Sequence, residues 1–216
     1  MTTRIKNGDK ILFIGDSITD CGRRGAERPL GNGYVKIFND FLISCEPEKR
    51  VEIINKGIGG DRVPGLLSRW GDDVLRHKPD WLSIKIGIND LYTHLRDPAS
   101  GVSPEKFEED YRKILRRTRR ELPRCKILLI QPFYITRETS RDSFRRQVLD
   151  ILPQYLKIVA RMSGEYKTRL LKTHAMFQKL LKYYEPDTFC NEPVHPNLTG
   201  HVAIASAVYD IFCGKW

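Results

Sequence analysis

Long apolar runs are absent from this sequence, and cysteine is scarce. No apolar stretch in the 216 residues approaches the length that a helix needs to cross a lipid bilayer. The N-terminus has no apolar core of the kind found in secretory signal peptides. The five cysteines are odd in number, scattered and without metal-site spacing, which favours reduced thiols over a disulfide framework. These features predict a cytoplasmic protein with no membrane partner.

Internal repeats, low-complexity segments and breaks in composition are missing as well. A chain of 216 residues is long enough for one complete hydrophobic core and slightly short for two domains. Without a linker to divide it, the sequence predicts a single domain over residues 1–216.

Acidic residues are fewer than basic ones, and the resulting net charge of +10 raises the question of nucleic-acid binding. The densest basic segment spans residues 112–120. Around it, apolar side chains recur at spacings of three and four, which indicates one buried stripe on a helix; they are Phe107, Tyr111, Ile114, Thr118 and Leu122. The arginines occupy the remaining faces. We therefore expect a solvated outer face and no nucleic-acid partner.

Short apolar runs rich in β-branched residues alternate with amphipathic segments of helical period. The expected strands are 11–14, 51–55, 81–86, 126–130 and, weakly, 170–171. The expected helices are 34–45, 66–74, one from 104, one over 144–159 that Pro153 should kink or split, 176–184, and one from 198 that should be buried all round. This alternation predicts a three-layer α/β fold with a parallel sheet covered on both faces.

Polar or glycine residues follow each of the first three expected strands. Ser17 follows the first, Gly60 the second and Asn89 the third. Because parallel strands end at one edge of the sheet, these residues are expected to converge where open α/β sheets bind ligands. Each has a structural alternative: Asp16 or Ser17 caps the next helix, Gly60 allows a turn, and Asn89 caps or turns.

Ester hydrolysis requires a nucleophile, a base and donors for the developing oxyanion. Ser17 offers a hydroxyl, while its own amide, the Gly60 amide and the Asn89 side chain offer three donors. His195 lies in a proline-flanked loop before the last helix and is the candidate base, although it could be a simple loop residue. These groups occur together and in the right order along the chain, three of them at the ends of expected strands. So many separate coincidences are improbable, which favours the catalytic interpretation.

Four sequence blocks resemble those of the SGNH hydrolases, also called GDSL esterases, and together they cover essentially the whole chain. The blocks are Gly15-Asp16-Ser17, Gly59-Gly60-Asp61, Gly87-Ile88-Asn89-Asp90 and Glu192-x-x-His195-Pro196. The resemblance implies a flavodoxin-like sandwich with a five-stranded parallel sheet. It also implies that Ser17 is the nucleophile, that Ser17, Gly60 and Asn89 form the oxyanion hole, and that His195 is the base. The chemistry that it implies needs no metal or other cofactor.

One block departs from the family pattern. The family's acid is usually an aspartate three residues before the histidine, whereas this chain has Glu192 at that position. A glutamate can orient and stabilise the imidazole in the same way. The alternatives are Asp187, earlier on the same loop, or a backbone carbonyl alone. We expect Glu192 to be the acid.

The stretches 15–22, 78–84 and 132–135 look most like bacterial acetylxylan esterases, which remove acetyl groups from xylo-oligosaccharides. The same chemistry on other esters is the first alternative: a lysophospholipase, a thioesterase or a general short-chain esterase. A catalytically inactive carbohydrate- or nucleic-acid-binding protein is the alternative from another class. A last helix ending in Phe212 and Trp216, together with the family's tendency to associate, suggests a homo-oligomer.

Overall fold

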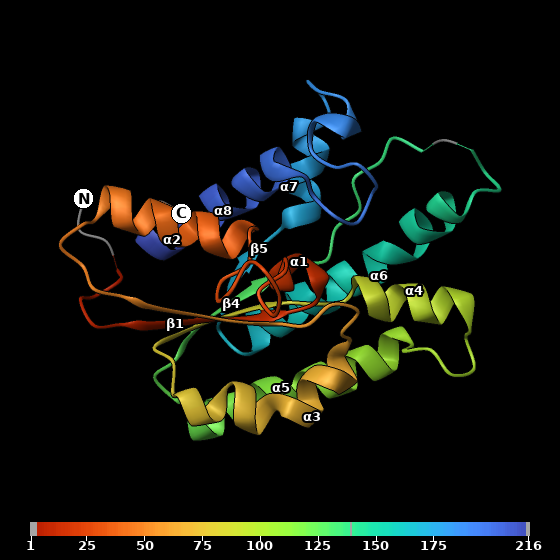
Figure 1. Cartoon of the computed structure of the whole chain (residues 1–216). Helices are drawn as coiled ribbons and strands as arrows, with labels where there is room; N and C mark the ends of the chain where they lie inside the picture. The colour runs from red at the N-terminus through yellow and green to blue at the C-terminus, as the bar shows by residue number, and fades with distance from the viewer. Residues whose placement is uncertain (1–3, 139, 215–216) are drawn as a thin grey trace.

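A five-stranded parallel sheet forms the middle layer of the molecule (Figure 1). The computed structural model describes residues 4–138 and 140–214. The strand order is β2-β1-β3-β4-β5, and every neighbouring pair is parallel. The strands are β1 (Lys10–Gly15), β2 (Glu52–Gly57), β3 (Trp81–Lys85), β4 (Lys126–Ile130) and β5 (Arg169–Leu171). The predicted α/β fold class is confirmed, including the weak fifth strand.

The register brings the ends of the three central strands level with one another. Gly15, the last residue of β1, pairs with Gly57 on β2 and with Lys85 on β3. A Cβ atom at Gly15 would lie 2.1 Å from the Lys85 carbonyl oxygen, so only glycine fits this position. The residues that follow the three strands therefore start from neighbouring points on one edge.

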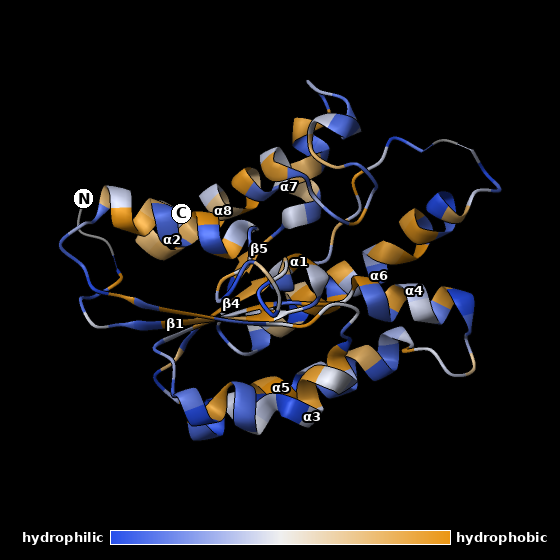
Figure 2. Ribbon diagram, in the orientation of Figure 1, coloured by the Kyte–Doolittle hydropathy of each residue, from blue (hydrophilic) through white to orange (hydrophobic). Residues whose placement is uncertain are grey.

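Helices cover both faces of the sheet, and Figure 2 shows that apolar residues concentrate in the strands between them. Helices α2 and α8 pack together on one face, and α3 and α5 pack together on the other. The α-helices are α1 (Ser17–Asp20), α2 (Tyr34–Cys45), α3 (Val63–Asp73), α4 (Ile88–Arg96), α5 (Pro104–Glu121), α6 (Phe144–Glu165), α7 (Thr173–Leu180) and α8 (Leu198–Cys213), and the short 3-10 helices are η1 (Leu75–His77) and η2 (Pro186–Thr188). No helix within the described ranges is long and apolar enough to span a membrane.

Several helices differ from the sequence prediction, and α7 begins and ends earlier than the predicted 176–184. Helices α1 and α4 were not expected, because α1 has only four residues and α4 buries only three of its nine side chains. Helix α6 continues through Pro153 and is not split. Buried residues on both sides of the proline, Val148 and Tyr155 among them, hold the helix despite the missing hydrogen bond. Helix α8 is not buried all round, since Leu198 and Val202 are exposed.

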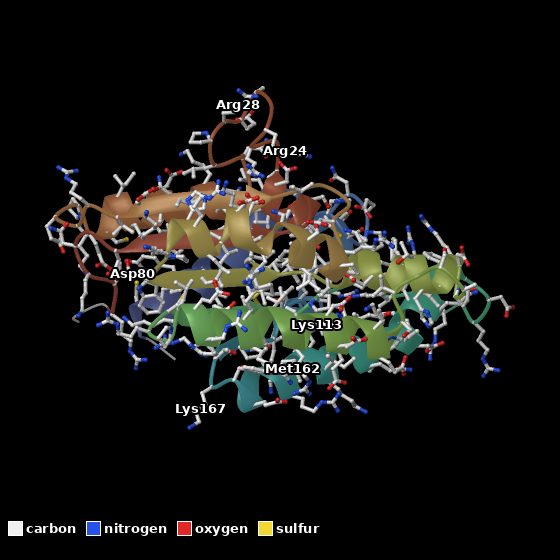
Figure 3. The ribbon with its side chains drawn as sticks, turned by 90° about the horizontal axis from the view of Figure 1, so that it is seen from below. Arg24, Arg28, Asp80, Lys113, Met162 and Lys167 are labelled. Atoms are coloured by element: carbon white, nitrogen blue, oxygen red, sulfur yellow. The ribbon has the colours of Figure 1, made fainter. Side chains whose placement is uncertain are left out.

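The basic segment lies on α5 as expected. Four of the five residues of the predicted stripe, Phe107, Tyr111, Ile114 and Thr118, are fully buried, whereas Leu122, just after the end of α5, is only partly buried. Figure 3 shows Lys113 on the outer side of this helix, and shows Arg24 and Arg28 on a separate loop that projects from the body. Acidic neighbours partner much of the charge on α5, as between Lys113 and Glu109. The positive charge on this face of α5 is therefore stabilised by ion pairs and by solvent.

The C-terminal helix packs into its own chain. Phe212 is completely buried and meets the Trp81 ring edge-on, with 4.8 Å between the ring centroids. Phe212 is therefore not available to a neighbouring copy. Trp216, the second residue on which the expected association depends, lies outside the described residues.

A completely buried ion pair joins β3 to the start of α1. The Lys85 Nζ atom lies 2.9 Å from Asp16 Oδ2, and neither side chain has any exposed surface. Burial lowers the pKa of Lys85, while the charge of Asp16 opposes that shift. The other oxygen of Asp16 accepts a hydrogen bond from the Ile18 amide and caps α1. The pair thus fixes the backbone on either side of Ser17.

The Lys85→Met variant should unfold more easily, because it leaves the Asp16 carboxylate buried without its counter-charge. Breaking a buried pair in this way costs about 3–5 kcal/mol of unfolding free energy. Urea denaturation at neutral pH measures the loss. The double variant Lys85→Met/Asp16→Asn should recover much of it, since no buried charge remains and asparagine still caps the helix. Equal losses in the single and double variants would contradict this account.

Candidate active site

Ser17 is the first residue of α1, directly after the end of β1. The preceding Asp16 caps the helix through its side chain, so the capping alternative holds for Asp16 while Ser17 remains free to act otherwise. The first amides of a helix have no acceptor inside the helix. The Ser17 amide and hydroxyl are therefore both presented at the carboxyl edge of the sheet.

Ser17, His195 and Glu192 form one chain of hydrogen bonds. The Ser17 Oγ atom lies 2.8 Å from His195 Nε2. On the other side of the ring, His195 Nδ1 donates to Glu192 Oε1. A carboxylate at Nδ1 fixes the tautomer in which Nε2 is the acceptor and faces the hydroxyl. The arrangement can remove a proton from Ser17.

Glu192 is held by its own loop. Its Oε1 atom accepts from the His195 amide at 2.8 Å, and its Oε2 atom accepts from the Val194 amide at 3.0 Å. These two bonds fold the side chain back towards the ring and accommodate the methylene by which glutamate exceeds aspartate. Asp187 lies in η2, and its backbone carbonyl accepts from the Asn197 side chain at 3.0 Å. Among the contacts of the described residues, the structure places Glu192 and not Asp187 against His195.

Gly60 and Asn89 flank the same edge. Asn89 donates one side-chain hydrogen to the Asp61 carbonyl at 3.1 Å, which orients the amide group and leaves its second hydrogen available. Gly60 has a φ of +77°, a left-handed conformation that favours glycine. A Cβ atom there would meet nothing within 4 Å, so open space lies beside this backbone.

Arg69 on α3 connects the segments around Gly60, and sequence reasoning missed it. Its guanidinium donates to Asp61 Oδ2 at 2.7 and 2.9 Å and to the Lys56 carbonyl at 2.8 Å. It also donates to Asp73 Oδ2 at 2.6 Å. The Arg69–Asp73 spacing of four was visible in the sequence, but the contacts with Asp61 and Lys56 are tertiary. Arg69 therefore ties the end of β2 to the loop that carries Gly60.

His201 is a second histidine close to the site that the motifs did not indicate. Its Nδ1 atom accepts from the Tyr34 amide at 3.2 Å, and its Nε2 atom lies 3.4 Å from Cys21 Sγ. Burial lowers the pKa of His201 to about 4, with smaller contributions from the charges of His195 and Lys85. His201 is consequently neutral at pH 7 and adds no positive charge beside His195.

Asp90, next to Asn89, is buried with only part of its carboxyl group bonded. Oδ1 accepts from the Val63 amide at 2.9 Å, at the start of α3, whereas Oδ2 has no partner among the described residues. Burial raises the pKa of Asp90 to about 7. Within the described ranges no cluster of His, Cys, Asp or Glu is placed to hold a metal ion.

The Asp90→Asn variant should gain stability over the wild type as the pH rises. The pKa of Asp90 is about 7 in the folded chain and about 3.9 in an unfolded one. Because the unfolded state gives up its proton first, the wild type loses about 4 kcal/mol of unfolding free energy between these two pKa values. Denaturation of both proteins at pH 4 and pH 8 measures the difference.

The Asp110→Asn variant is the matched control. Asp110 is buried to a similar degree, but its carboxylate is paired with Lys106 at 3.1 Å and Lys113 at 2.9 Å. Replacing it should give no gain at high pH. An Asp90→Asn protein whose advantage does not grow with pH would contradict the assignment of a protonated Asp90.

Known proteins share both the sequence pattern and the fold. The model of the GDSL-like lipase/acylhydrolase family matches residues 13–203. An acetylxylan esterase of Geobacillus stearothermophilus is 37% identical over 213 residues, which cover 94% of each protein. Its crystal structure matches this fold with a TM-score of 0.83 at 35% identity, over 95% of this chain and 94% of that one. Solved variants described as catalytic mutants of that esterase replace a serine, an aspartate and a histidine with alanine.

Two further proteins extend the comparison. An alpha/beta hydrolase enzyme from the metagenome of Lake Arreo, Spain, matches with a TM-score of 0.85 at 30% identity, over 98% of both chains. The thioesterase 1/protease 1/lysophospholipase L1 of Escherichia coli (strain K12) is 25% identical over 115 residues, which cover 53% of this chain and 48% of that protein. With the family match extending over most of the sequence and all four blocks present, the chain belongs to the GDSL-like lipase/acylhydrolase family.

Proposed function

We propose that the protein is a serine esterase that removes acetyl groups from xylo-oligosaccharides or related acetylated carbohydrates. The observation that carries the proposal is the 2.8 Å contact between Ser17 Oγ and His195 Nε2, with Glu192 bonded to the opposite ring nitrogen. The nearly full-length similarity to an acetylxylan esterase supports the substrate class.

In the proposed reaction, His195 takes the proton from Ser17 as the hydroxyl attacks the acetyl carbonyl. Glu192 keeps the imidazole in the required tautomer and stabilises its positive charge. His195 then protonates the departing sugar oxygen, which leaves an acetyl group on Ser17. Water attacks this acetyl-enzyme with His195 again as the base, releasing acetate. No step calls for a metal or another cofactor.

The oxyanion would be bound by the amides of Ser17 and Gly60 and by the side chain of Asn89. Such donors act mainly on the transition state, and losing one typically costs about 10²–10³ in kcat. Asn89 is suited to this role because the Asp61 carbonyl already holds one of its two hydrogens and thereby aims the other.

Other esters are the alternative substrates for the same site. A general short-chain esterase, a thioesterase or a lysophospholipase would use the same Ser17–His195–Glu192 group, and the partial similarity to the Escherichia coli enzyme favours considering them. An inactive carbohydrate- or nucleic-acid-binding protein would have no use for the bonded serine, histidine and glutamate. We therefore place catalysis ahead of binding alone.

Three broader features belong to the proposal. The chain would act as one domain, in the cytoplasm and as a homo-oligomer. The five free cysteines support a reducing compartment. The exposed Leu198 and Val202, one turn apart on α8, offer apolar surface of the kind found between subunits.

The Ser17→Ala variant should lose at least about 10⁴-fold in kcat/KM on acetylated xylo-oligosaccharides, because the nucleophile is removed. Acetate release measures this, together with a nitrophenyl ester series of increasing chain length on the wild type, which should favour acetate. Ser68→Ala is the control, since Ser68 is exposed on α3 and its hydroxyl donates to the Gly65 carbonyl of the same helix. Near-normal activity in Ser17→Ala would refute the proposed nucleophile. A preference for long acyl chains would instead indicate a lipid or thioester substrate.

The Glu192→Gln variant should lower kcat by about 10³–10⁴, because an amide favours the wrong imidazole tautomer. Asp187→Asn should change kcat little, since the structure bonds the Asp187 backbone and not its carboxylate to the loop. Glu192→Asp should keep more activity than Glu192→Gln, because a carboxylate remains. The opposite ranking of Glu192→Gln and Asp187→Asn would transfer the role of the acid to Asp187.

A further inference from the structure

A cavity of about 860 Å³ lies at the edge of the sheet, against β5 and between α7 and α8. Figure 1 shows α7 and α8 on the same side of the sheet. The walls of this cavity share no residue with the Ser17–His195–Glu192 group. Its volume is within the range of small-molecule binding sites. It is therefore a second candidate site, separate from the proposed catalytic centre.

The inner walls of the cavity are apolar. Side chains from three elements contribute to them: Leu170 and Leu171 from β5, Met176 and Leu180 from α7, and Ala207 and Ile211 from α8. Apolar surface of this kind is stabilised when a hydrocarbon group displaces water from it. Methionine adapts its shape readily to such a group. The walls thus suit a flexible apolar chain.

All the charged residues around the cavity are basic. They are Arg4, Arg169, Lys172 and Lys179, and no aspartate or glutamate lines it. None of the four forms an ion pair with an acid in the described part of the chain, whereas Lys36, Arg76 and Arg146, for example, each pair with an aspartate. The charged lining of the cavity is therefore entirely basic and has no acidic partner of its own among the described residues.

Among the four basic residues of the cavity, Arg169 is the one that a bound anion would stabilise most. Its guanidinium lies over the Trp81 ring, 5.5 Å from the centroid, and one nitrogen donates to the Ile211 carbonyl. Burial lowers the pKa of Arg169, and the neighbouring charge of Arg4 lowers it further. A partly buried cation beside a like charge is stabilised by a carboxylate, which the guanidinium can bind through two parallel hydrogen bonds.

We propose that this cavity binds an amphipathic anion with one flexible acyl chain and a carboxylate head, such as a medium-chain fatty acid. The acyl chain lies on the walls formed by β5, α7 and α8. The carboxylate binds Arg169 and Arg4, with Lys172 and Lys179 at the rim. This site does not depend on the proposed esterase activity, because it uses none of the same residues.

Calorimetric titration of the full chain with dodecanoate, below its micelle concentration, tests the proposal. We expect one dodecanoate per chain, and binding at least about tenfold weaker for dodecanol or dodecyltrimethylammonium, because neither makes the charged hydrogen bonds. Binding should persist after Ser17 has been blocked by an organophosphonate. No saturable binding, several molecules per chain, or loss of binding on blocking Ser17 would each overturn the proposal.

Two variants locate the site. Arg169→Gln should weaken dodecanoate binding about tenfold or more. Since Arg169 also contacts Trp81, Ala175→Phe provides a second variant: Ala175 is an exposed residue on the cavity wall, and the larger ring should fill the cavity and prevent binding. Lys157→Gln, an exposed substitution on α6, is the control and should leave binding unchanged.

Unchanged binding in both Arg169→Gln and Ala175→Phe would refute the assignment. Sedimentation tests the alternative that the cavity is part of an interface between copies of the chain. If dodecanoate does not bind and Ala175→Phe dissociates an oligomer of the wild type, the cavity belongs to an interface between copies of the chain and the proposal is wrong.

Discussion

The buried Asp16–Lys85 ion pair is the interaction on which the geometry around Ser17 depends. Two opposite charges with no exposed surface must stay together, because separating them would leave each unsolvated in the core. Lys85 ends β3 and Asp16 immediately follows β1, so the pair fixes two neighbouring strands at the edge where the serine stands. The same carboxylate caps α1, which adds the orientation of the helix to the constraint. The position of Ser17 therefore depends on the buried Asp16–Lys85 ion pair as much as on the turn between β1 and α1.

The sheet edge was predictable from the sequence, and the links between its parts were not. Ser17, Gly60 and Asn89 each follow an apolar run, and parallel strands necessarily end together. Lys85 lies inside the apolar run 81–86. Because an isolated buried charge is unfavourable, its position there indicates an internal ion pair. The contact between Arg69 and Asp61 could not be predicted from the sequence, because Asp61 lies on a loop whose conformation depends on the whole fold. Local periodicity likewise could not reveal α1, which is a single turn.

The catalytic histidine and glutamate proposed here are held by hydrogen bonds more than by burial. The side chains of His195 and Glu192 are 56% and 48% exposed, so water screens the attraction between them. What fixes Glu192 is the pair of amide donors at Val194 and His195, which also explains why a longer acid fits a position usually occupied by aspartate. The spacing of Glu192 and His195 was predictable from the sequence, whereas the backbone hydrogen bonds that accommodate the longer side chain were not.

The two halves of the site are supported by separate parts of the fold. Arg69 anchors the Gly60 side from within α3, through contacts with Asp61 and Lys56, whereas the loop of Glu192 and His195 carries its own internal hydrogen bonds. The two halves are therefore held in place independently of each other. None of the hydrogen bonds of the Arg69 guanidinium described above involves the loop before α8, so a change within that loop would leave them in place. One wall beside Ser17 would thus keep its geometry even where the loop on the opposite side adopts a different conformation.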